Sequence, residues 1–210
     1  MTAVKPSKVR VIGTLIVVAV LILLVLDTTT RSDNAPRVTG REVFDAAAYG
    51  EKNYDAKVVP AIEKKAVALD TLVPALKKDP DAAGKQYGSR QGSSPYNYAV
   101  TGEGTAGKAE NGLLPVKVKG ADGATVNVQI GPAINGTSLR DAVGFITFNQ
   151  FVNQVDYADA ATALNNQVKA KVLKGLEPAS LEGKKVSFTG AFTSLVPNTI
   201  TVTPIRLEVS

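Results

Sequence analysis

The spacing of hydrophobic residues changes several times along the chain, and each spacing predicts a different element. Val11–Leu26 has no charged side chain over sixteen positions, close to the roughly 20 apolar residues that a membrane-spanning helix needs. Lys5, Lys8 and Arg10 precede this run, so the positive-inside rule places the rest of the chain across the membrane. We therefore interpret residues 1–27 as a cytoplasmic stub followed by a transmembrane anchor.

Two other interpretations of this run stay open. A cleaved signal peptide has an apolar core of about 7–15 residues and a small-residue cleavage site, and the following DTTTRSDNA offers no clear site. A buried helix of a soluble domain is the third interpretation. The first two both place the folded part outside the cytoplasm. Residues 28–40 are polar and predict a tether, and residues 41–210 predict an extracytoplasmic α+β domain.

A helical repeat dominates the start of that domain, from Asp45 to Leu76. Pro60 and Pro74 lack the amide hydrogen that bonds four residues back, so we expect kinks or breaks there. Asp79-Pro80 predicts the start of a short helix, and we expect the helical part to cover residues 41–92. One apolar stripe is expected from the residues spaced three or four apart: Tyr54, Val58, Ile62, Ala66, Leu69, Val73 and Leu76.

Residues 93–210 show mostly the period of two that is typical of strands. Tyr96–Val100 predicts one strand. Two further alternating runs, 116–118 and 126–130, flank Asp122-Gly123 and predict a hairpin, because Gly tolerates positive φ at a tight turn. The five predicted strands are completed by 186–192 and 200–209, where a change of phase at Thr203-Pro204 indicates a bulge.

Two helices are predicted between the third and fourth strands. Ser138–Asp141 fits a helix-capping pattern, and Tyr157–Lys174 has helical periodicity with Gly175 suited to its end. Three strands, a helix and two strands is the order of an OB barrel. The predicted fold class is therefore α+β, with an N-terminal membrane-anchor helix, a helical segment and then a five-stranded OB-like β-barrel with a helix between strands 3 and 4.

Composition excludes several kinds of chemistry. The chain has no Cys and no His, which removes disulfides, thiolate nucleophiles, imidazole bases and the usual zinc ligands. The net charge is +5, and Lys5, Lys8 and Arg10 account for three of these charges because no acidic residue precedes Asp27. The remaining excess is weak, so we expect no nucleic-acid partner. We also expect no cofactor and no metal.

Several stretches in a fixed order resemble a known family, the predicted periplasmic lipoproteins of unknown function that are often encoded beside ribose-type sugar ABC transporters. The matching stretches are AYGEKNYDAKVVPAIEKKAV, DPDAAGKQYG, SPYNY, INGTSLRDAVGFITFNQFVNQVDYADAATALN, and GKKVSFTGAFT with TPIRLEV. The resemblance covers most of Phe44–Val209 and implies no catalytic residues. The family description implies a lipidated Cys, which this sequence does not contain. Any anchoring must therefore rest on the hydrophobic run.

The segment from Phe145 to Gln154 alternates aromatic and amide side chains. Aromatic faces stack on sugar rings, and amides both donate and accept hydrogen bonds, so this pattern is one candidate ligand surface. Core packing of the Phe side chains, with the amides holding a loop, is the alternative that we favour. The candidate ligand residues in and beside this segment are Arg140, Asp141, Phe148, Asn149, Asn153 and Gln154.

A second candidate surface lies at the start of the first strand. Arg90, Tyr96 and Asn97 would line a pocket there, or simply form a turn that leads into the strand. In OB barrels the face of strands two and three often binds oligonucleotides or oligosaccharides. The outward positions expected on that face are Lys117, Lys119, Thr125, Asn127 and Gln129, which include no aromatic ring for base stacking.

The sequence does not determine a molecular activity. Our leading hypothesis is a non-enzymatic accessory or binding module, tethered to the outer face of the cytoplasmic membrane through Val11–Leu26. From the resemblance, it would serve a sugar ABC uptake system and bind a small carbohydrate. A carboxylate-dependent enzyme acting on envelope carbohydrate and a purely structural envelope protein are the alternatives.

Overall fold

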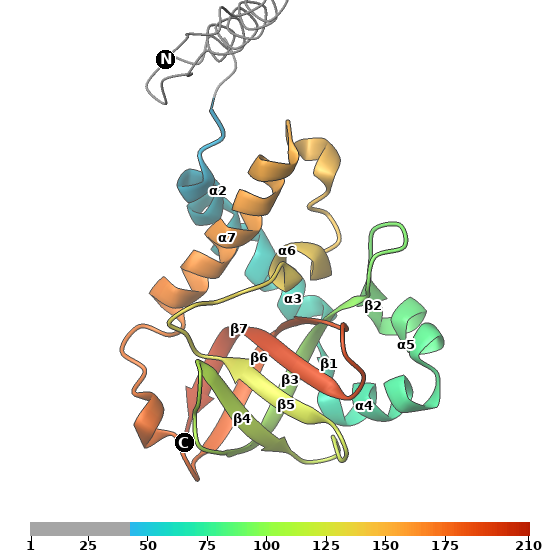
Figure 1. The fold of residues 1–210 in the computed structure, drawn as a ribbon, viewed down its shortest axis with the longest axis vertical. Helices are drawn as coiled ribbons and strands as arrows, with labels where there is room; N and C mark the ends of the chain where they lie inside the picture. Colours follow the sequence, from blue (N-terminus) through green and yellow to red (C-terminus); the bar gives the residue numbers. More distant parts are fainter. Residues whose placement is uncertain (1–42) are drawn as a thin grey trace, which may run out of the picture. The chain divides into compact units, whose positions relative to one another are not determined.

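Helices dominate residues 46–87, the first part of the range 43–210 that our computed structural model describes (Figure 1). The predicted anchor and tether lie outside these residues. No helix within 43–210 is long and apolar enough to cross a membrane. The first helical elements are α2 (Ala46–Asn53), the π-helical turn η1 (Tyr54–Val58), α3 (Val59–Lys65), α4 (Leu69–Lys78) and α5 (Pro80–Tyr87).

The rest of this range contains a closed β-barrel, as the sequence predicts. Its strands are β3 (Asn97–Ala106), β4 (Leu113–Val118), β5 (Thr125–Gln129), β6 (Lys185–Thr193) and β7 (Thr199–Val209). They pair in the order β3–β4–β5–β7–β6, and β6 pairs with β3 to close the barrel. Only β5 and β7 run parallel within this ring. The two-residue strands β1 (Val67–Ala68) and β2 (Gly88–Ser89) add to β3 outside the ring.

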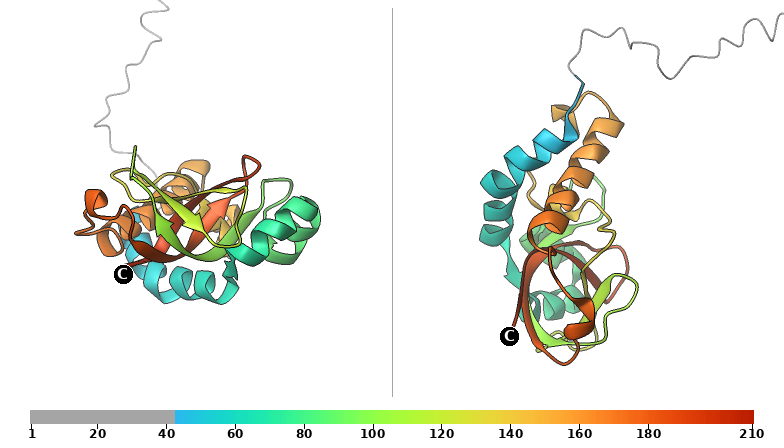
Figure 2. Two further views of the ribbon diagram at one scale, coloured as in Figure 1. Left: turned by 90° about the horizontal axis from the view of Figure 1, so that it is seen from below. Right: turned by 90° about the vertical axis from the view of Figure 1, so that its left-hand side faces the viewer.

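The connection from β5 to β6 carries the helices that cover one part of the barrel. These are α6 (Ser138–Ala142), the 3-10 turn η2 (Phe148–Gln150), α7 (Gln154–Lys171) and the 3-10 turn η3 (Pro178–Ser180). Helices α2 and α7 pack side by side (Figures 1 and 2). Gly50 makes this approach possible, because a Cβ there would lie 3.0 Å from the carbonyl oxygen of Ala163.

Two hydrophobic cores stabilise this arrangement. One fills the barrel, and its largest side chains include Tyr98, Leu114 and Phe192. The other lies between the helices and the outer surface of the barrel, where Ala99, Ala191 and Ile205 face outward into it. The outer surface of β3, β6 and β7 is therefore covered along one half of the strands only.

A bulge in β7 lets Ile205 reach the second core. The register places Gly190 opposite Pro204 but Thr189 opposite Arg206, so Ile205 is the extra residue. Pro204 lacks an amide hydrogen, which a bulge tolerates. The predicted bulge at Thr203-Pro204 is confirmed.

Neither Pro60 nor Pro74 breaks its helix. The helix is π-helical directly before α3, so its geometry changes close to Pro60, and Pro74 lies inside an uninterrupted α4. Asp70 and Pro74 are both exposed, so the carbonyl of Asp70 that lost its helical donor can bond to water. The chain instead breaks at Ala66, which has an extended backbone.

This break divides the predicted apolar stripe between the two cores. Tyr54, Val58 and Ile62 enter the helical core, whereas Leu69 and Val73 enter the barrel. Helix periodicity alone could not show the change, because both halves keep the same spacing.

The boundaries of α7 also differ from the prediction. The helix begins at Gln154, three residues before Tyr157, because the Asn153 side chain accepts a 2.9 Å hydrogen bond from the amide of Asp156. It ends at Lys171, so Gly175 lies in the following loop rather than directly at the helix end.

Candidate functional site

Arg140 and Asp141 form a local ion pair inside the protein. The Arg140 side chain is 9% exposed, and its Nε and Nη2 donate to the two Asp141 oxygens at 2.7 and 3.1 Å. Its Nη1 donates to the Tyr157 carbonyl at 3.0 Å, and its guanidinium carbon lies 3.5 Å from the centre of the Tyr157 ring. Thr137 Oγ1 donates to Asp141 at 2.6 Å. These partners occupy the charged groups, so the pair holds α6 against α7.

Tyr157 and Gln91 complete this cluster, although neither is a predicted site residue. Tyr157 donates to Asp141 at 3.3 Å, and Gln91 Nε2 donates to the Tyr157 oxygen at 3.0 Å and to the Ile146 carbonyl at 2.9 Å. Burial and the nearby Asp141 carboxylate raise the pKa of the Tyr157 hydroxyl. Gln91, next to Arg90, thus links the loop before the first strand to the Phe145–Gln154 segment. Its amide is used for these internal hydrogen bonds.

The predicted residues of the 145–154 segment do not converge on a cavity. Asn153 is the N-cap of α7, and Phe148 packs edge-on against Tyr157 with ring centres 5.8 Å apart. Asn149 and Gln154 are exposed. Asn153 therefore caps a helix, and this role replaces its interpretation as a ligand residue.

The residues predicted at the start of the first strand are also structural. Asn97 is buried, donates to the Pro95 carbonyl at 3.2 Å and accepts from Thr193 Oγ1 at 2.6 Å. The guanidinium carbon of Arg90 lies 4.2 Å from the centre of the Tyr96 ring. These contacts fix the junction between the loop and β3.

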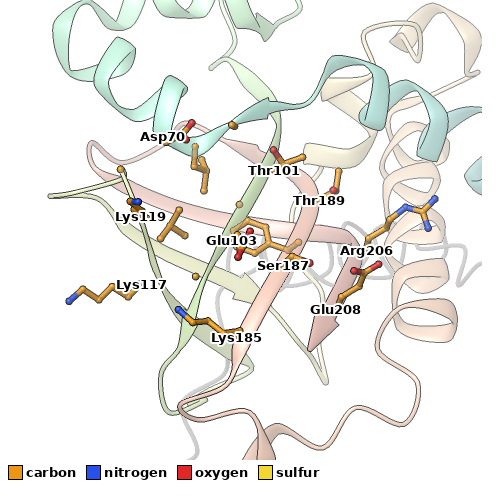
Figure 3. A pocket seen from close by; sticks show the side chains of 17 residues that line it. Asp70, Thr101, Glu103, Lys117, Lys119, Lys185, Ser187, Thr189, Arg206 and Glu208 are labelled. Atoms are coloured by element: carbon orange, nitrogen blue, oxygen red, sulfur yellow. The ribbon is translucent and has the colours of Figure 1, made fainter. Parts of the chain in front are cut away.

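A groove of about 760 Å³ lies elsewhere, on the half of the β3–β6–β7 surface that the helices leave open (Figure 3). Two cross-strand rows form its floor. Thr101, Thr189 and Arg206 are register partners in one row, and Glu103, Ser187 and Glu208 in the next. The polar residues that line the groove are Asp70, Thr101, Glu103, Lys117, Lys119, Lys185, Ser187, Thr189, Arg206 and Glu208.

Glycines of β3 make room for packing on the barrel side, beneath the floor of the groove. A Cβ on Gly102 would lie 2.4 Å from the Phe188 ring, and a Cβ on Gly104 would lie 2.3 Å from the Lys117 carbonyl oxygen. Phe188 is itself buried, so the floor offers backbone and small hydroxyl side chains rather than an exposed aromatic face. The groove therefore presents donors and acceptors at close range to a polar ligand.

Cationic and anionic groups both line the groove. Lys117 comes from β4, Lys119 from directly after it and Lys185 from β6, and Asp70 lies at the start of α4 (Figure 3). Arg206 forms an ion pair with Glu63 of α3, which raises the pKa of the guanidinium. The mixture suits a neutral or zwitterionic polar ligand better than a polyanion.

The structure corrects part of the expectation for the face of the second and third strands. Lys117 and Lys119 are exposed and belong to the groove. Gln129 is buried: its amide nitrogen donates to Thr203 Oγ1 at 2.8 Å and to the Asn135 carbonyl at 3.0 Å. The alternation along β5 predicts an outward Gln129 side chain, but the loop after β5 folds over this side chain.

Sequence reasoning missed the groove because its residues resemble an ordinary solvent-facing strand pattern. Thr101, Glu103, Ser187 and Thr189 are small or polar residues at alternate positions of two distant strands. Only the pairing of β3 with β6 brings them together. Gly102 and Gly104 do not signal the groove, because the space that they leave is filled by close packing on the barrel side.

Comparison with known proteins now supplies a family. The model of the predicted periplasmic lipoprotein family DUF2291 matches residues 15–208. The chain belongs to this family. The DUF2291 family has no assigned molecular function, and its description makes the protein extracytoplasmic and membrane-associated. A search of curated proteins gives no match.

A solved structure supports the fold of this DUF2291 protein. The chain is similar to an OB-fold protein (TM0957) from Thermotoga maritima, with a TM-score of 0.68 and 23% sequence identity. The similarity covers 80% of this chain and 100% of that one. At this identity the comparison establishes the OB architecture and nothing about ligands.

Proposed function

We propose that this DUF2291 protein is a non-enzymatic binding module, held on the outer face of the cytoplasmic membrane by Val11–Leu26. The observation that carries the proposal is the polar groove on the open half of the β3–β6–β7 surface. Thr101, Ser187 and Thr189 offer hydroxyls there, and Glu103 offers a carboxylate. Hydroxyls and carboxylates are the groups that hydrogen-bond to the hydroxyls of a small carbohydrate.

The resemblance to proteins encoded beside sugar transporters supports the choice of ligand class. The module would hold or deliver a sugar for an ABC uptake system in the same membrane. Detergent extracts provide a test of this part. Affinity purification of the full chain is expected to recover transporter subunits, and their repeated absence contradicts the transport role.

A screen with pentoses and hexoses tests the groove itself. We expect at least one sugar to raise the melting temperature in a saturable way, as ligands of the native state do. Glu103→Ala and Ser187→Ala remove groups on the groove floor and are expected to weaken that ligand about tenfold or more. Asn149→Ala is the matched control on the exposed segment and is expected to bind normally.

Two results would contradict the groove as the binding site. One is that no sugar of the panel changes the melting temperature of the full chain. The other is that Asn149→Ala removes binding while Glu103→Ala and Ser187→Ala keep it. The second result would return the site to the segment predicted from the sequence.

A specific arrangement keeps the carboxylate-dependent enzyme as a second candidate. Glu103 and Glu208 share one row of the groove floor with Ser187 between them. Strands lie about 4.8 Å apart, so the two backbone positions are roughly 10 Å apart, near the span of an inverting glycosidase. Both side chains are exposed, however, whereas a general acid needs an apolar environment.

Turnover measurements separate the two candidates. An enzyme would cleave a glycan of an envelope panel and lose that activity in both Glu103→Gln and Glu208→Gln. A binding module would retain the sugar unchanged over the same incubation. We expect the second result.

A further inference from the structure

An exposed apolar segment lies at the opposite end of the domain from the barrel. Eight large hydrophobic side chains are exposed within residues 43–210, and four of them lie between residues 145 and 155. Phe145 and Phe148 are 41% and 37% exposed, and Val152 and Val155 are 62% and 65% exposed. Such a concentration on a monomer usually marks an interaction surface.

Hydrogen bonds and ring contacts hold this segment in place. Gln150 Nε2 donates to the Phe145 carbonyl at 2.8 Å, and the amide of Phe151 donates to the Phe148 carbonyl at 2.9 Å. The Phe151 ring packs between Tyr49 and Tyr157, with centres 5.6 and 5.3 Å away. The fold therefore displays the four apolar side chains on a supported surface.

The chain enters the domain at this same end. The Phe44 ring lies 5.5 Å from Phe151 and 5.4 Å from Tyr49, next to the N-cap of α2. The start of α2 and the connection from α6 to α7 lie together, away from the barrel, in Figure 1 and in the right-hand view of Figure 2. The proposed anchor, Val11–Leu26, precedes this end of the domain in the sequence, with the predicted tether of residues 28–40 between them.

The charges at this end identify the physical nature of the partner. Residues 44–51 and 144–160 contain no Lys or Arg, whereas Asp45, Glu51 and Asp156 are present. An anionic surface would repel these carboxylates, so attraction has to come from burial of apolar side chains.

We propose that the 145–155 segment inserts its apolar side chains into the headgroup–acyl boundary of the lipid bilayer. The inference rests on the proposed anchoring by Val11–Leu26, which brings this end of the domain to the bilayer. Insertion leaves the barrel at the far end, in water (Figure 1). Because apolar burial drives it, contact needs no anionic lipid and is insensitive to salt.

Site-directed labelling tests this directly, because the chain has no Cys of its own. Val152→Cys carries an environment-sensitive fluorophore in the full chain, reconstituted into phosphatidylcholine vesicles. Lys117→Cys on the barrel is the matched control. We expect lipid-attached nitroxides to quench the Val152 label at least several-fold more than the Lys117 label, and aqueous iodide to show the reverse order. Added phosphatidylglycerol or salt should not increase the difference.

A second variant separates lipid contact from the label itself. With the fluorophore at Asn149→Cys, the further change Val155→Asp places a charge in the bilayer boundary. Nitroxide quenching is expected to fall about tenfold, while the circular dichroism spectrum stays unchanged.

Three results overturn the proposal, and each has a different meaning. Equal iodide quenching of both labels shows that the segment stays in water although the chain is anchored. Protection from both iodide and lipid nitroxides shows that protein, such as a second copy, covers the segment. Failure of the chain to float with the vesicles removes the anchor, and with it the proposed function.

Discussion

Asp141 illustrates, at the scale of single residues, how a promising charge pair becomes structural. Its carboxylate accepts from Arg140, Thr137 and Tyr157, and its side chain is 18% exposed. Arg140 is more deeply buried and relies on this counter-charge. Both carboxylate oxygens and all three guanidinium nitrogens thus make internal hydrogen bonds, as expected of a structural pair.

Replacing Asp141 by Asn tests this role. Asp141→Asn leaves a buried guanidinium without its counter-charge, and we expect the free energy of unfolding to fall by about 3 kcal/mol. Urea unfolding followed by circular dichroism measures the loss. Asp159→Asn on the exposed side of α7 serves as control and should change stability by less than about 0.5 kcal/mol. A loss below about 1 kcal/mol for Asp141→Asn would contradict the assignment.

Tyr54 is a residue whose hydroxyl works against stability. It is 1% exposed, and its oxygen is a buried polar atom without a hydrogen-bond partner among residues 43–210. Tyr54→Phe keeps the packing and removes the unpaired group. We expect the free energy of unfolding to rise by about 1 kcal/mol, measured by the same urea unfolding. A clear destabilisation would mean that the hydroxyl has a stabilising partner.

At the scale of elements, caps and breaks decide where the helices begin and end. The start of the helix at Pro80 was predictable, because the Asp79 side chain accepts from the amides of Asp81 and Ala82. The start of α7 differs from the predicted one, because the sequence analysis treats Asn153 as a candidate ligand residue and not as a cap. The break at Ala66 has no sequence signal of its own, since it is set by the pairing of Val67 with Val100.

Asn153→Ala separates capping from ligand binding. Loss of the cap is expected to lower the free energy of unfolding by about 1 kcal/mol and to leave sugar binding unchanged. The comparison is Asn149→Ala, an exposed neighbour in η2 with an expected change below about 0.5 kcal/mol. Equal stability of the two variants would exclude the capping role.

Strands were predicted better than the surface that they form. Alternation located the five barrel strands and the bulge at Pro204, because a half-buried strand leaves a period of two in the sequence. It could not show which outward residues meet across strands. Thr101 and Thr189 are 88 positions apart in sequence, yet they are direct register partners in the groove floor.

At the scale of the whole molecule, buried tyrosines predict how stability depends on pH. Burial raises the pKa of Tyr98 from 10.0 to about 12, and burial also raises the pKa values of Tyr49, Tyr54 and Tyr157. The native state thus keeps protons that the unfolded chain releases near pH 10. This stabilisation is complete below pH 10 and is lost as the pH rises through about 12.

Alkaline titration checks this prediction with two signals. Tyrosinate absorbance of the buried tyrosines is expected to appear together with the loss of the circular dichroism signal, between pH 10 and about 12. Tyr98→Phe removes one of these groups and should make stability less dependent on pH in that window. Ionisation of the buried tyrosines in a protein that remains fully folded would contradict the prediction.

We assign the two ends of the domain to different surroundings. The barrel carries the polar groove, and the described chain begins at the other end, next to Phe44. The sequence supports this division through Val11–Leu26 and the cations before it, and the DUF2291 family description agrees that the protein is extracytoplasmic.

Protease treatment of intact spheroplasts that express the full chain tests this most directly. We expect added protease to digest the folded domain while a cytoplasmic marker protein survives, and detergent to be required to release the undigested chain from the membrane fraction. A domain that is protected in intact spheroplasts and digested only after lysis would reverse the topology and contradict the account.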